Sequence, residues 1–170
     1  TPILGRPCLS ATFSAASADF NFKSRAAREY ASGLGAHMAD STTDLASRAN
    51  VLILSLPASA HVLSTIRTIE PFLTSRHIIV DTSTVDPATS REGARIAGLK
   101  GARYVDAPIL GRPSAAGKWL LPSGGPADAI ETVRPILETF ARSAVRVGDT
   151  GTGNAFKLLN QLMFSVINGI

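Results

Sequence analysis

The sequence predicts an α/β protein in which a mostly parallel sheet is covered by helices on both faces. Short apolar runs that end at Pro, Gly or polar residues alternate along the chain with segments of helical periodicity. Strands that alternate with helices form parallel sheets through crossover connections. Hydrophobic residues make up 45% of the 170 residues and charged residues 18%, which is enough apolar material for a folded core.

Six segments are predicted as strands. The first clear strand, residues 51–56, is a Leu- and β-branched run typical of a strand buried on both faces, and residues 77–82 form a second such strand. Residues 103–106 and 145–147 follow, each closed by Pro or Gly a little further on. Residues 18–22 and 119–121 give weaker signals.

Helices are predicted between these strands, over residues 41–49 and 60–72 and in three later segments. Asp86 and Pro87 provide an N-cap and a favourable first position for a helix that Gly101 closes. A helix that starts at Pro126 is expected to kink or split at Pro135, which has no N–H to donate. A last helix starts near residues 150–151.

Composition excludes several functional classes. The net charge of +4 comes from dispersed Lys and Arg, and the aromatic residues are one Trp, two Tyr and seven Phe, so we predict no nucleic-acid partner. No apolar run is long enough to cross a bilayer, so we predict no membrane partner. Cys8 is the single cysteine, which excludes an internal disulfide framework. A mild positive field suits a phosphate-bearing cofactor or an acidic small molecule.

The first 30 residues carry a basic bias that bears on localisation. Arg6, Lys23, Arg25 and Arg28 stand against two acidic residues, which is a bias found in transit peptides. Residues 24–30 nevertheless look like folded sequence. We therefore predict a cytoplasmic protein, with a mitochondrial location as the alternative.

Ligands of parallel sheets bind beyond the carboxyl ends of the strands. The segments to inspect are therefore residues 23–25, 57–59, 83–85 and 107–113. The later part of the chain adds a glycine-containing segment at the start of the last helix.

Four motifs in these segments carry a family resemblance. In order they are Ser55-Leu-Pro, Asp81-Thr-Ser-Thr-Val-Asp-Pro, Asp106-Ala-Pro, and Gly151-Thr-Gly-Asn-Ala-Phe-Lys-Leu-Leu-Asn. Each motif is weak alone, but four in this order and spacing resemble the β-hydroxyacid dehydrogenase family, which includes 3-hydroxyisobutyrate dehydrogenase and the 6-phosphogluconate dehydrogenase-like proteins. The resemblance implies a Rossmann-like NAD(P)-binding domain that ends in the start of a long inter-domain helix.

The resemblance also implies an activity, namely hydride transfer between NADP(H) and a small hydroxy acid or a related carbonyl or imine substrate. Lys157 occupies the position of the family's catalytic lysine, which exchanges a proton with the substrate oxygen. Thr84 matches the threonine beside the nicotinamide, and Leu56 and Pro57 match the turn under the cofactor. Spacing alone also allows Lys157 to be an ordinary lysine on a solvated helix face.

Substrate contacts are expected from two places. Asn160 and Gln161 follow Lys157 on the same helical face. Gly111 is retained where the family has substrate-binding glycines, and Arg112 either pairs with a carboxylate or faces solvent. Leu110 stands where the family usually has a serine.

Glycines and acids at the start of the last helix are expected to shape it. Gly151 and Gly153 let the backbone approach closely at a helix start that favours anions. Asp149 is expected to contribute a cap there. Asp81 and Asp106 end strands and are expected to be hydrogen-bonded structural groups.

Cofactor specificity is predicted from Lys23, Ser24 and Arg25. Positive charge after the second strand of such a fold favours the 2′-phosphate of NADP, whereas an acidic residue favours NAD. We therefore predict NADP, with NAD as the alternative, because cations at a helix start are also common without a ligand. His37, His61 and His77 lack metal-ligand spacing, so we predict no metal and place all three at the surface or a strand edge.

Two departures from the family define the predicted organisation. Residues 1–20 lack the glycine-rich strand and turn that cradles the pyrophosphate, so they form an atypical N-terminal segment. Residues 21–148 are the Rossmann-like domain, and residues 149–170 start the inter-domain helix of a second, helical domain that is absent. The alternative function is therefore a non-catalytic or truncated NADP-binding remnant, with weak or no cofactor binding.

The predicted absence of the helical domain has a consequence for the last helix. Its apolar stripe, Phe156, Leu159, Met163 and Val166, would have nothing to cover it, which predicts self-association. A complete protein with the helical domain is expected to be a homo-oligomer that acts on a small-molecule substrate.

Overall fold

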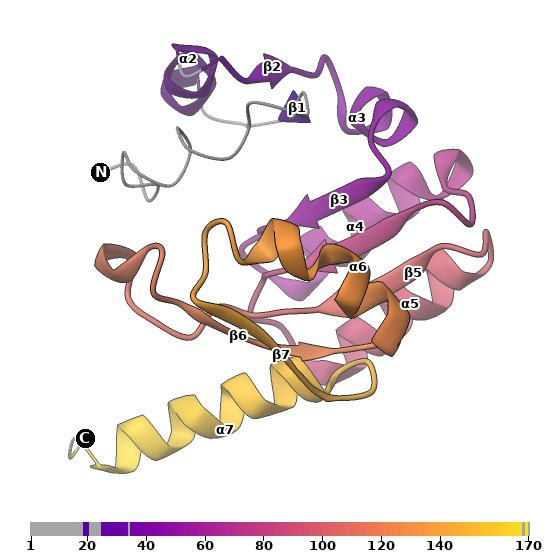
Figure 1. Ribbon diagram of the computed structural model, residues 1–170. Helices are drawn as coiled ribbons and strands as arrows, with labels where there is room; N and C mark the ends of the chain where they lie inside the picture. Colours follow the sequence, from indigo (N-terminus) through magenta and orange to yellow (C-terminus); the bar gives the residue numbers. More distant parts are fainter. Residues whose placement is uncertain (1–18, 21–24, 34, 168, 170) are drawn as a thin grey trace.

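A five-stranded sheet forms the centre of the protein, with the strand order β3-β4-β5-β6-β7 (Figure 1). The computed structural model describes residues 19–20, 25–33, 35–167 and 169. Strands β3, β4 and β5 run parallel in register, β6 is antiparallel to β5, and β7 is parallel to β6. This confirms the predicted mostly parallel sheet. The strands are β3 (Val51–Leu54), β4 (Ile78–Asp81), β5 (Arg103–Asp106), β6 (Leu120–Gly124) and β7 (Ser143–Gly148).

A second, two-stranded sheet comes first in the chain. Its strands β1 (Asp19–Phe20) and β2 (His37–Met38) are parallel and are joined through helix α2 (Arg25–Gly33). Strand β1 falls within the weak prediction for residues 18–22, whereas β2 has no counterpart among the predicted strands. The expectation about residues 1–18 lies outside the described residues.

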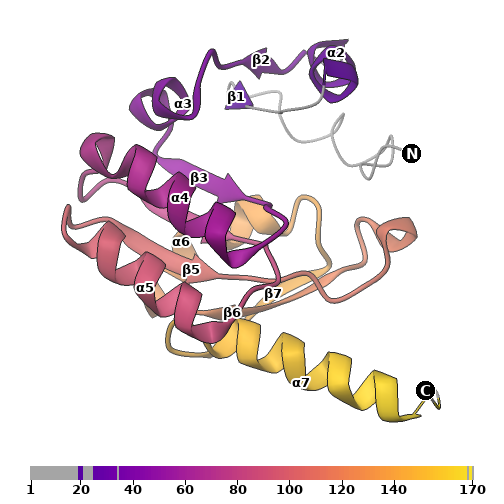
Figure 2. The same cartoon turned by 180° about the vertical axis from the view of Figure 1, so that it is seen from behind.

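Helices cover both faces of the larger sheet, as predicted. Figures 1 and 2 show α4 and α5 on one face and α6 on the other. Helix α3 contacts α4, and α7 packs against β6 and β7. The helices are α3 (Thr42–Arg48), α4 (Ser59–Ile69), α5 (Pro87–Gly98), α6 (Ala127–Leu137) and α7 (Thr152–Ile167), with short 3-10 turns η1 (Glu70–Phe72) and η2 (Pro113–Ala115).

Local signals set the ends of α5 as expected. The Oδ1 of Asp86 accepts the Ala88 N–H at 2.6 Å, and Pro87 occupies the first helical position. Gly101 adopts a φ of +75°, which a residue with a side chain rarely adopts, just beyond the helix end.

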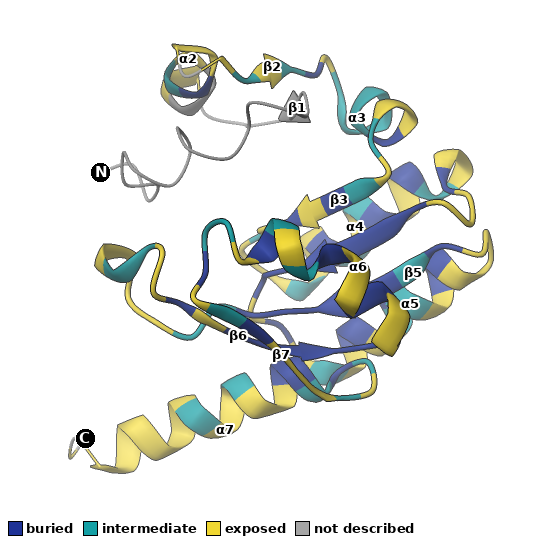
Figure 3. Ribbon diagram, viewed as in Figure 1, coloured by how far each residue is buried: buried dark blue, intermediate teal, exposed yellow. Residues whose placement is uncertain are grey.

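Alternate residues of the central strands pack into two apolar cores, one on each face of the sheet. Ile79 packs with α4 and α5, whereas Ile78 and Val80 pack with α6, so β4 is buried on both faces as predicted. The same prediction for β3 is wrong, because Ile53 is 42% exposed. Figure 3 shows part of β3 in the colour of exposed residues. Helix α6 contacts β5 and β7, so it leaves that face of β3 partly open.

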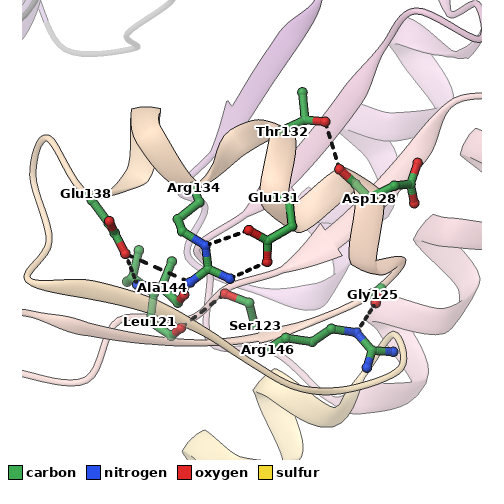
Figure 4. A network of polar contacts seen from close by, with 10 residues as sticks. All are labelled: Leu121, Ser123, Gly125, Asp128, Glu131, Thr132, Arg134, Glu138, Ala144 and Arg146. Carbon is green, nitrogen blue, oxygen red and sulfur yellow. Dashed lines mark hydrogen bonds and ion pairs between the residues drawn. The ribbon is translucent and has the colours of Figure 1, made fainter.

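Helix α6 runs through Pro135 as one helix, so the expected split into two short helices is wrong, whereas the kink stays a prediction. Pro135 lies two residues before the helix end at Leu137, where the loss of one hydrogen bond is tolerated more easily than in the middle. The neighbouring Arg134 ties this turn to the sheet, since its guanidinium donates to the Ala144 carbonyl of β7 and pairs with Glu131 (Figure 4).

The sequence predicts His77 at the surface or at a strand edge. It lies immediately before β4 and is buried, so a place at the surface is wrong. Its Nδ1 accepts the Thr74 N–H at 2.9 Å, so Nε2 carries the proton and donates to the Ala46 carbonyl at 3.0 Å. The imidazole therefore links α3 to the start of β4 as a structural group.

Helix α7 leaves the sheet with most of its length exposed (Figure 3). The exposed fractions of its large apolar side chains run from 41% at Leu158 to 74% at Ile167. Across the described part of the chain, no helix has both the length and the apolarity that a bilayer span needs.

Candidate functional site

Three segments meet at the carboxyl edge of the parallel strands. The ladder of hydrogen bonds continues past the strand ends, with Thr82 donating to the Leu54 carbonyl and Ala107 to the Asp81 carbonyl, both at 2.8 Å. The Leu56 N–H then donates to the Ser83 Oγ at 2.8 Å. The turn after β3 and the segment after β4 are thus joined directly.

Thr84 lies at this edge in a backbone segment that hydrogen bonds hold in place. Its side chain is exposed, whereas its neighbours Ser83 and Val85 are buried. The Ser83 N–H donates to Asp81 at 2.9 Å, which holds the segment against the end of β4. Pro57 is exposed on the neighbouring turn, and Leu56 packs partly against the α4 and α5 core.

Asp81 is a buried carboxyl that holds the segment of Thr84 in place. Burial raises its pKa, and hydrogen bonds from Ser83 and Tyr104 act in the opposite direction. The Tyr104 hydroxyl donates to Asp81 at 2.7 Å, and burial together with the Asp81 charge raises the tyrosine pKa. Tyr104 therefore stays neutral and acts as a donor.

Asp106, rather than Asp149, holds the start of α7. Its two carboxyl oxygens accept the N–H groups of Gly151 at 2.6 Å and Asn154 at 2.8 Å. The Asp149 carboxylate instead pairs with Arg146 at 2.9 Å and is exposed, while its backbone carbonyl accepts the Thr152 N–H. The expected side-chain cap by Asp149 is therefore corrected, whereas the structural roles expected of Asp81 and Asp106 are confirmed.

The start of α7 holds an anionic group, as expected, and that group is the carboxylate of Asp106. A helix start offers unpaired N–H groups and a positive dipole end. Here the carboxylate of Asp106 already uses two of these N–H groups from inside the protein. Burial raises the pKa of Asp106, and the hydrogen bonds from Gly151 and Asn154 oppose that rise.

Close approach at the two glycines is confirmed. Gly151 has a φ of +95°. A Cβ on Gly153 would lie 2.5 Å from the carbonyl oxygens of both Asp106 and Pro122, so only glycine fits between β5 and β6. The glycines place α7 directly on the end of the sheet.

The side chain of Lys157 on α7 contacts the segment that follows β5. Its Nζ donates to the Ile109 carbonyl at 2.9 Å, and the side chain is partly buried. Burial lowers the pKa of this amine. The side chain is therefore not that of a lysine projecting freely from a solvated helix face, which was the alternative that spacing allowed.

The expected substrate residues are less closely joined. Asn160 is half-buried near Lys157 on α7, and Gln161 is exposed. Gly111 has a φ of +144°, and a Cβ there would lie 2.5 Å from the Trp119 ring, so its glycine has a local structural reason. The Arg112 carbonyl accepts the Trp119 Nε1–H at 2.8 Å, and the Arg112 residue is exposed.

Among the three residues expected to select NADP, Arg25 is described. It is exposed at the first position of α2, and its Nε pairs with Glu29 at 2.8 Å. Lys23 and Ser24 lie outside the described residues. Among the described residues, no group of three His, Cys, Asp or Glu side chains is placed to hold a metal ion.

Sequence reasoning missed the link between these segments. Asn154 lies inside the glycine-containing motif but was not singled out, although its side chain contacts Val85 and Ser90. Ser83 lies beside Thr84 and connects it to Leu56. The signal that could have found both is their place within the quoted motifs, directly beside the expected functional residues.

The sheet, its crossover helices and this edge define the class of Rossmann-like nucleotide-binding domains. Residues 9–148 match the family described as the NAD binding domain of 6-phosphogluconate dehydrogenase. The chain belongs to this family, within the 3-hydroxyisobutyrate dehydrogenase and 6-phosphogluconate dehydrogenase-like group. The match begins before the boundary at residue 20 that we set from the sequence.

Curated relatives agree with this assignment. The chain is 33% identical over 141 residues to a probable mitochondrial 3-hydroxyisobutyrate dehydrogenase of Dictyostelium discoideum, covering 78% of this chain and 43% of the relative. It is 33% identical over 138 residues to the 3-hydroxyisobutyrate dehydrogenase of Pseudomonas aeruginosa, covering 78% of this chain and 46% of the relative. The chain thus spans less than half the length of either relative.

Solved structures share the fold. A putative oxidoreductase from Mycobacterium avium superposes with a TM-score of 0.87 at 24% identity, covering 98% of this chain and 61% of the other. An imine reductase from Myxococcus stipitatus in complex with NADP+ gives 0.82 at 24% identity, covering 95% and 58%. A variant of that enzyme was solved in complex with NAD+.

Proposed function

We propose that this chain is the cofactor-binding part of an NADP-dependent oxidoreductase of the 3-hydroxyisobutyrate dehydrogenase type. The observation that carries the proposal is the placement of Lys157. Its partly buried amine contacts the segment after β5, and the helix that carries it is hydrogen-bonded to the segment of Thr84. A candidate proton donor and a candidate cofactor contact thus share one edge of the sheet.

The residues at this edge fit a dinucleotide. Pro57 and Thr84 are both exposed, and their neighbours Leu56 and Ser83 are hydrogen-bonded to each other at the strand ends, where nucleotides lie on such sheets. Helix α4 starts directly after this turn with Ala58 as its N-cap and no capping side chain. Its first N–H groups therefore suit a phosphate.

A bound nicotinamide would supply the hydride acceptor or donor. The role proposed for Lys157 is to pass a proton between its Nζ and the substrate oxygen. Burial lowers the pKa of this amine, which brings its proton exchange closer to neutral pH. The Ile109 carbonyl accepts a hydrogen bond from the amine and so aims it.

The proposed substrate is a small hydroxy acid or a related carbonyl or imine compound. Relatives named 3-hydroxyisobutyrate dehydrogenase support the hydroxy acid. Imine reductases among the proteins of the same fold support the imine as a second class. Asn160 follows Lys157 at helical spacing, so its amide is the first candidate for a substrate contact. The further candidates are Gln161 on the same helix, and Gly111 and Arg112 in the segment after β5.

Preference for NADP is proposed from the positive charge of residues 23–25. The test is a pair of fluorescence titrations of this chain with NADPH and with NADH. Tighter binding of NADPH is expected, and tighter binding of NADH would overturn the preference.

The proposed role of Lys157 is tested with Lys157→Ala. The variant is expected to retain cofactor binding and to lose turnover of small 3-hydroxy acids. Cofactor binding by both proteins without turnover by either would favour the alternative, a non-catalytic NADP-binding remnant. No binding of NADPH or NADH by the unaltered chain would contradict the proposed function.

We propose further that copies of this chain associate through α7, whose outer face is apolar. The proposed compartment is the cytoplasm, with mitochondria as the alternative. Relatives support both locations, since one is named mitochondrial and another is bacterial.

A further inference from the structure

Asn154 is a fully buried amide whose polar groups are all used. Its backbone N–H donates to Asp106 at 2.8 Å, and its Oδ1 accepts the Val85 N–H at 3.1 Å. Its Nδ2 donates to the Ser90 Oγ at 3.1 Å. Its exposed fraction is 0%, so water does not compete for these bonds.

The partners of Asn154 belong to segments distant in the sequence. Val85 directly follows Thr84, and Ser90 lies in the first turns of α5. Lys157 lies three residues beyond Asn154 on α7, about one helical turn away. One side chain thus joins the segment of Thr84 to the helix that carries Lys157.

We propose that Asn154 is a positioning residue that fixes the separation between Thr84 and the amine of Lys157. The inference rests on the proposed function, in which a nicotinamide lies beside Thr84 and exchanges hydride with a substrate that Lys157 protonates. Small displacements between reacting groups have large effects on rate, so a rigid link between the two residues has a direct use.

Two features separate this link from ordinary packing of α7. Asp106 already holds the helix start to β5 through Gly151 and Asn154 backbone bonds, so the helix does not depend on the amide for its place on β5. The amide side chain adds contacts to β4 and α5 segments instead. It therefore sets the position of the Thr84 segment relative to α7.

The test uses the unaltered chain, Asn154→Leu and Ser90→Ala, without cofactor. Leucine removes both side-chain bonds at similar volume and leaves the buried Val85 N–H unpaired. Native-state amide exchange at Val85 is expected to speed up about tenfold or more in Asn154→Leu. The pKa of Lys157, followed by NMR with labelled lysine, is expected to rise toward the ordinary lysine value as the amine gains water.

The Ser90→Ala variant removes one anchor of the amide and keeps its bond to Val85. A smaller acceleration at Val85 is expected, and this variant carries the test if Asn154→Leu does not fold. Val133→Ala is the control. Val133 is a buried residue of α6 in the other apolar core, so its truncation is expected to lower stability without touching the link.

The positioning role is overturned if Val85 exchange and Lys157 titration change no more in the variants than in Val133→Ala. These measurements do not need a nucleotide, so they separate the two proposals. A chain that binds neither NADPH nor NADH would contradict the proposed function even where Asn154 behaves as expected.

Discussion

The first turn of α7 and the rest of the same helix are opposite environments. Gly151, Gly153 and Asn154 are buried against β5 and β6, and the Asp106 carboxylate accepts two of their N–H groups. From Leu158 to Ile167, every large apolar side chain is exposed by 41% or more. Figure 3 shows this change from buried to exposed along one helix.

Apolar composition alone therefore does not show which half of α7 is fixed to the rest of the protein. The apolar half contributes little to the fold as described, because its side chains have left water only in part. The half with two glycines and an amide is fixed by directed hydrogen bonds. Lys157 lies between the two halves, where it is partly buried and keeps one polar partner.

The largest expected effect comes from breaking the buried half with Asp106→Ala. The Gly151 and Asn154 N–H groups would lose their acceptor without gaining water. We expect a loss of about 2–6 kcal/mol in the free energy of unfolding, since each of the two unsatisfied buried donors costs about 1–3 kcal/mol. Urea unfolding followed by circular dichroism measures it.

Asp149→Ala is the matched control for that variant. Asp149 is also an acid near the start of α7, but its carboxylate is exposed and pairs with Arg146. No measurable loss of stability is expected. Equal losses in the two variants would contradict the assignment of Asp106 as the group that holds the helix.

A smaller effect, which depends on pH, is expected at Asp81. Burial raises its pKa in the folded state, so its contribution to stability is complete below about pH 4 and is lost as the pH rises through the raised value. Asp81→Asn lacks this loss, because asparagine keeps an acceptor for Ser83 and has no proton to release.

The stability of Asp81→Asn relative to the unaltered protein is therefore expected to improve as the pH rises above about pH 4, the ordinary range of an aspartate. Urea unfolding of both proteins at several pH values measures the difference. A difference that stays constant, or that favours the unaltered protein as the pH rises, would count against the raised pKa.

The smallest effect on stability is expected from the exposed half, with Leu162→Lys. Leu162 is exposed, so the free energy of unfolding should change by less than about 0.5 kcal/mol. Self-association should fall, because the lysine interrupts the apolar face. Sedimentation velocity measures this, and a monodisperse monomer for the unaltered chain would refute self-association through α7.

Sequence reasoning predicted most of the fold because the central strands carry strong patterns. β4 and β5 are β-branched or aromatic runs closed by turn residues, and α5 has an N-cap followed by proline. β2 was not predicted, because a strand of two residues shows no hydrophobic periodicity. The split predicted at Pro135 was wrong, because the free-energy cost of a proline in a helix depends on how close it lies to the helix end, which local sequence does not fix.

The site was predictable in part for a similar reason. Motif order indicated Thr84 and Lys157, which the structure links through Val85 and Asn154. The choice between Asp106 and Asp149 was not available from local sequence, because the acid that holds α7 lies 45 residues before Gly151 and the nearer acid faces solvent. Likewise, the burial of His77 depends on its contact with Ala46 of α3, 31 residues earlier in the chain, which local sequence does not show.

We propose that a nicotinamide dinucleotide binds across the carboxyl edge of the sheet, between Thr84 and Lys157. The most direct measurement is the change in backbone amide NMR shifts of the chain on addition of NADPH. We predict that the largest changes cluster at Leu56, Thr84 and Lys157, while Ser75 and Gly101 beside the opposite ends of the strands stay unchanged. Saturable changes centred on that opposite end, or none at any residue, would contradict the account.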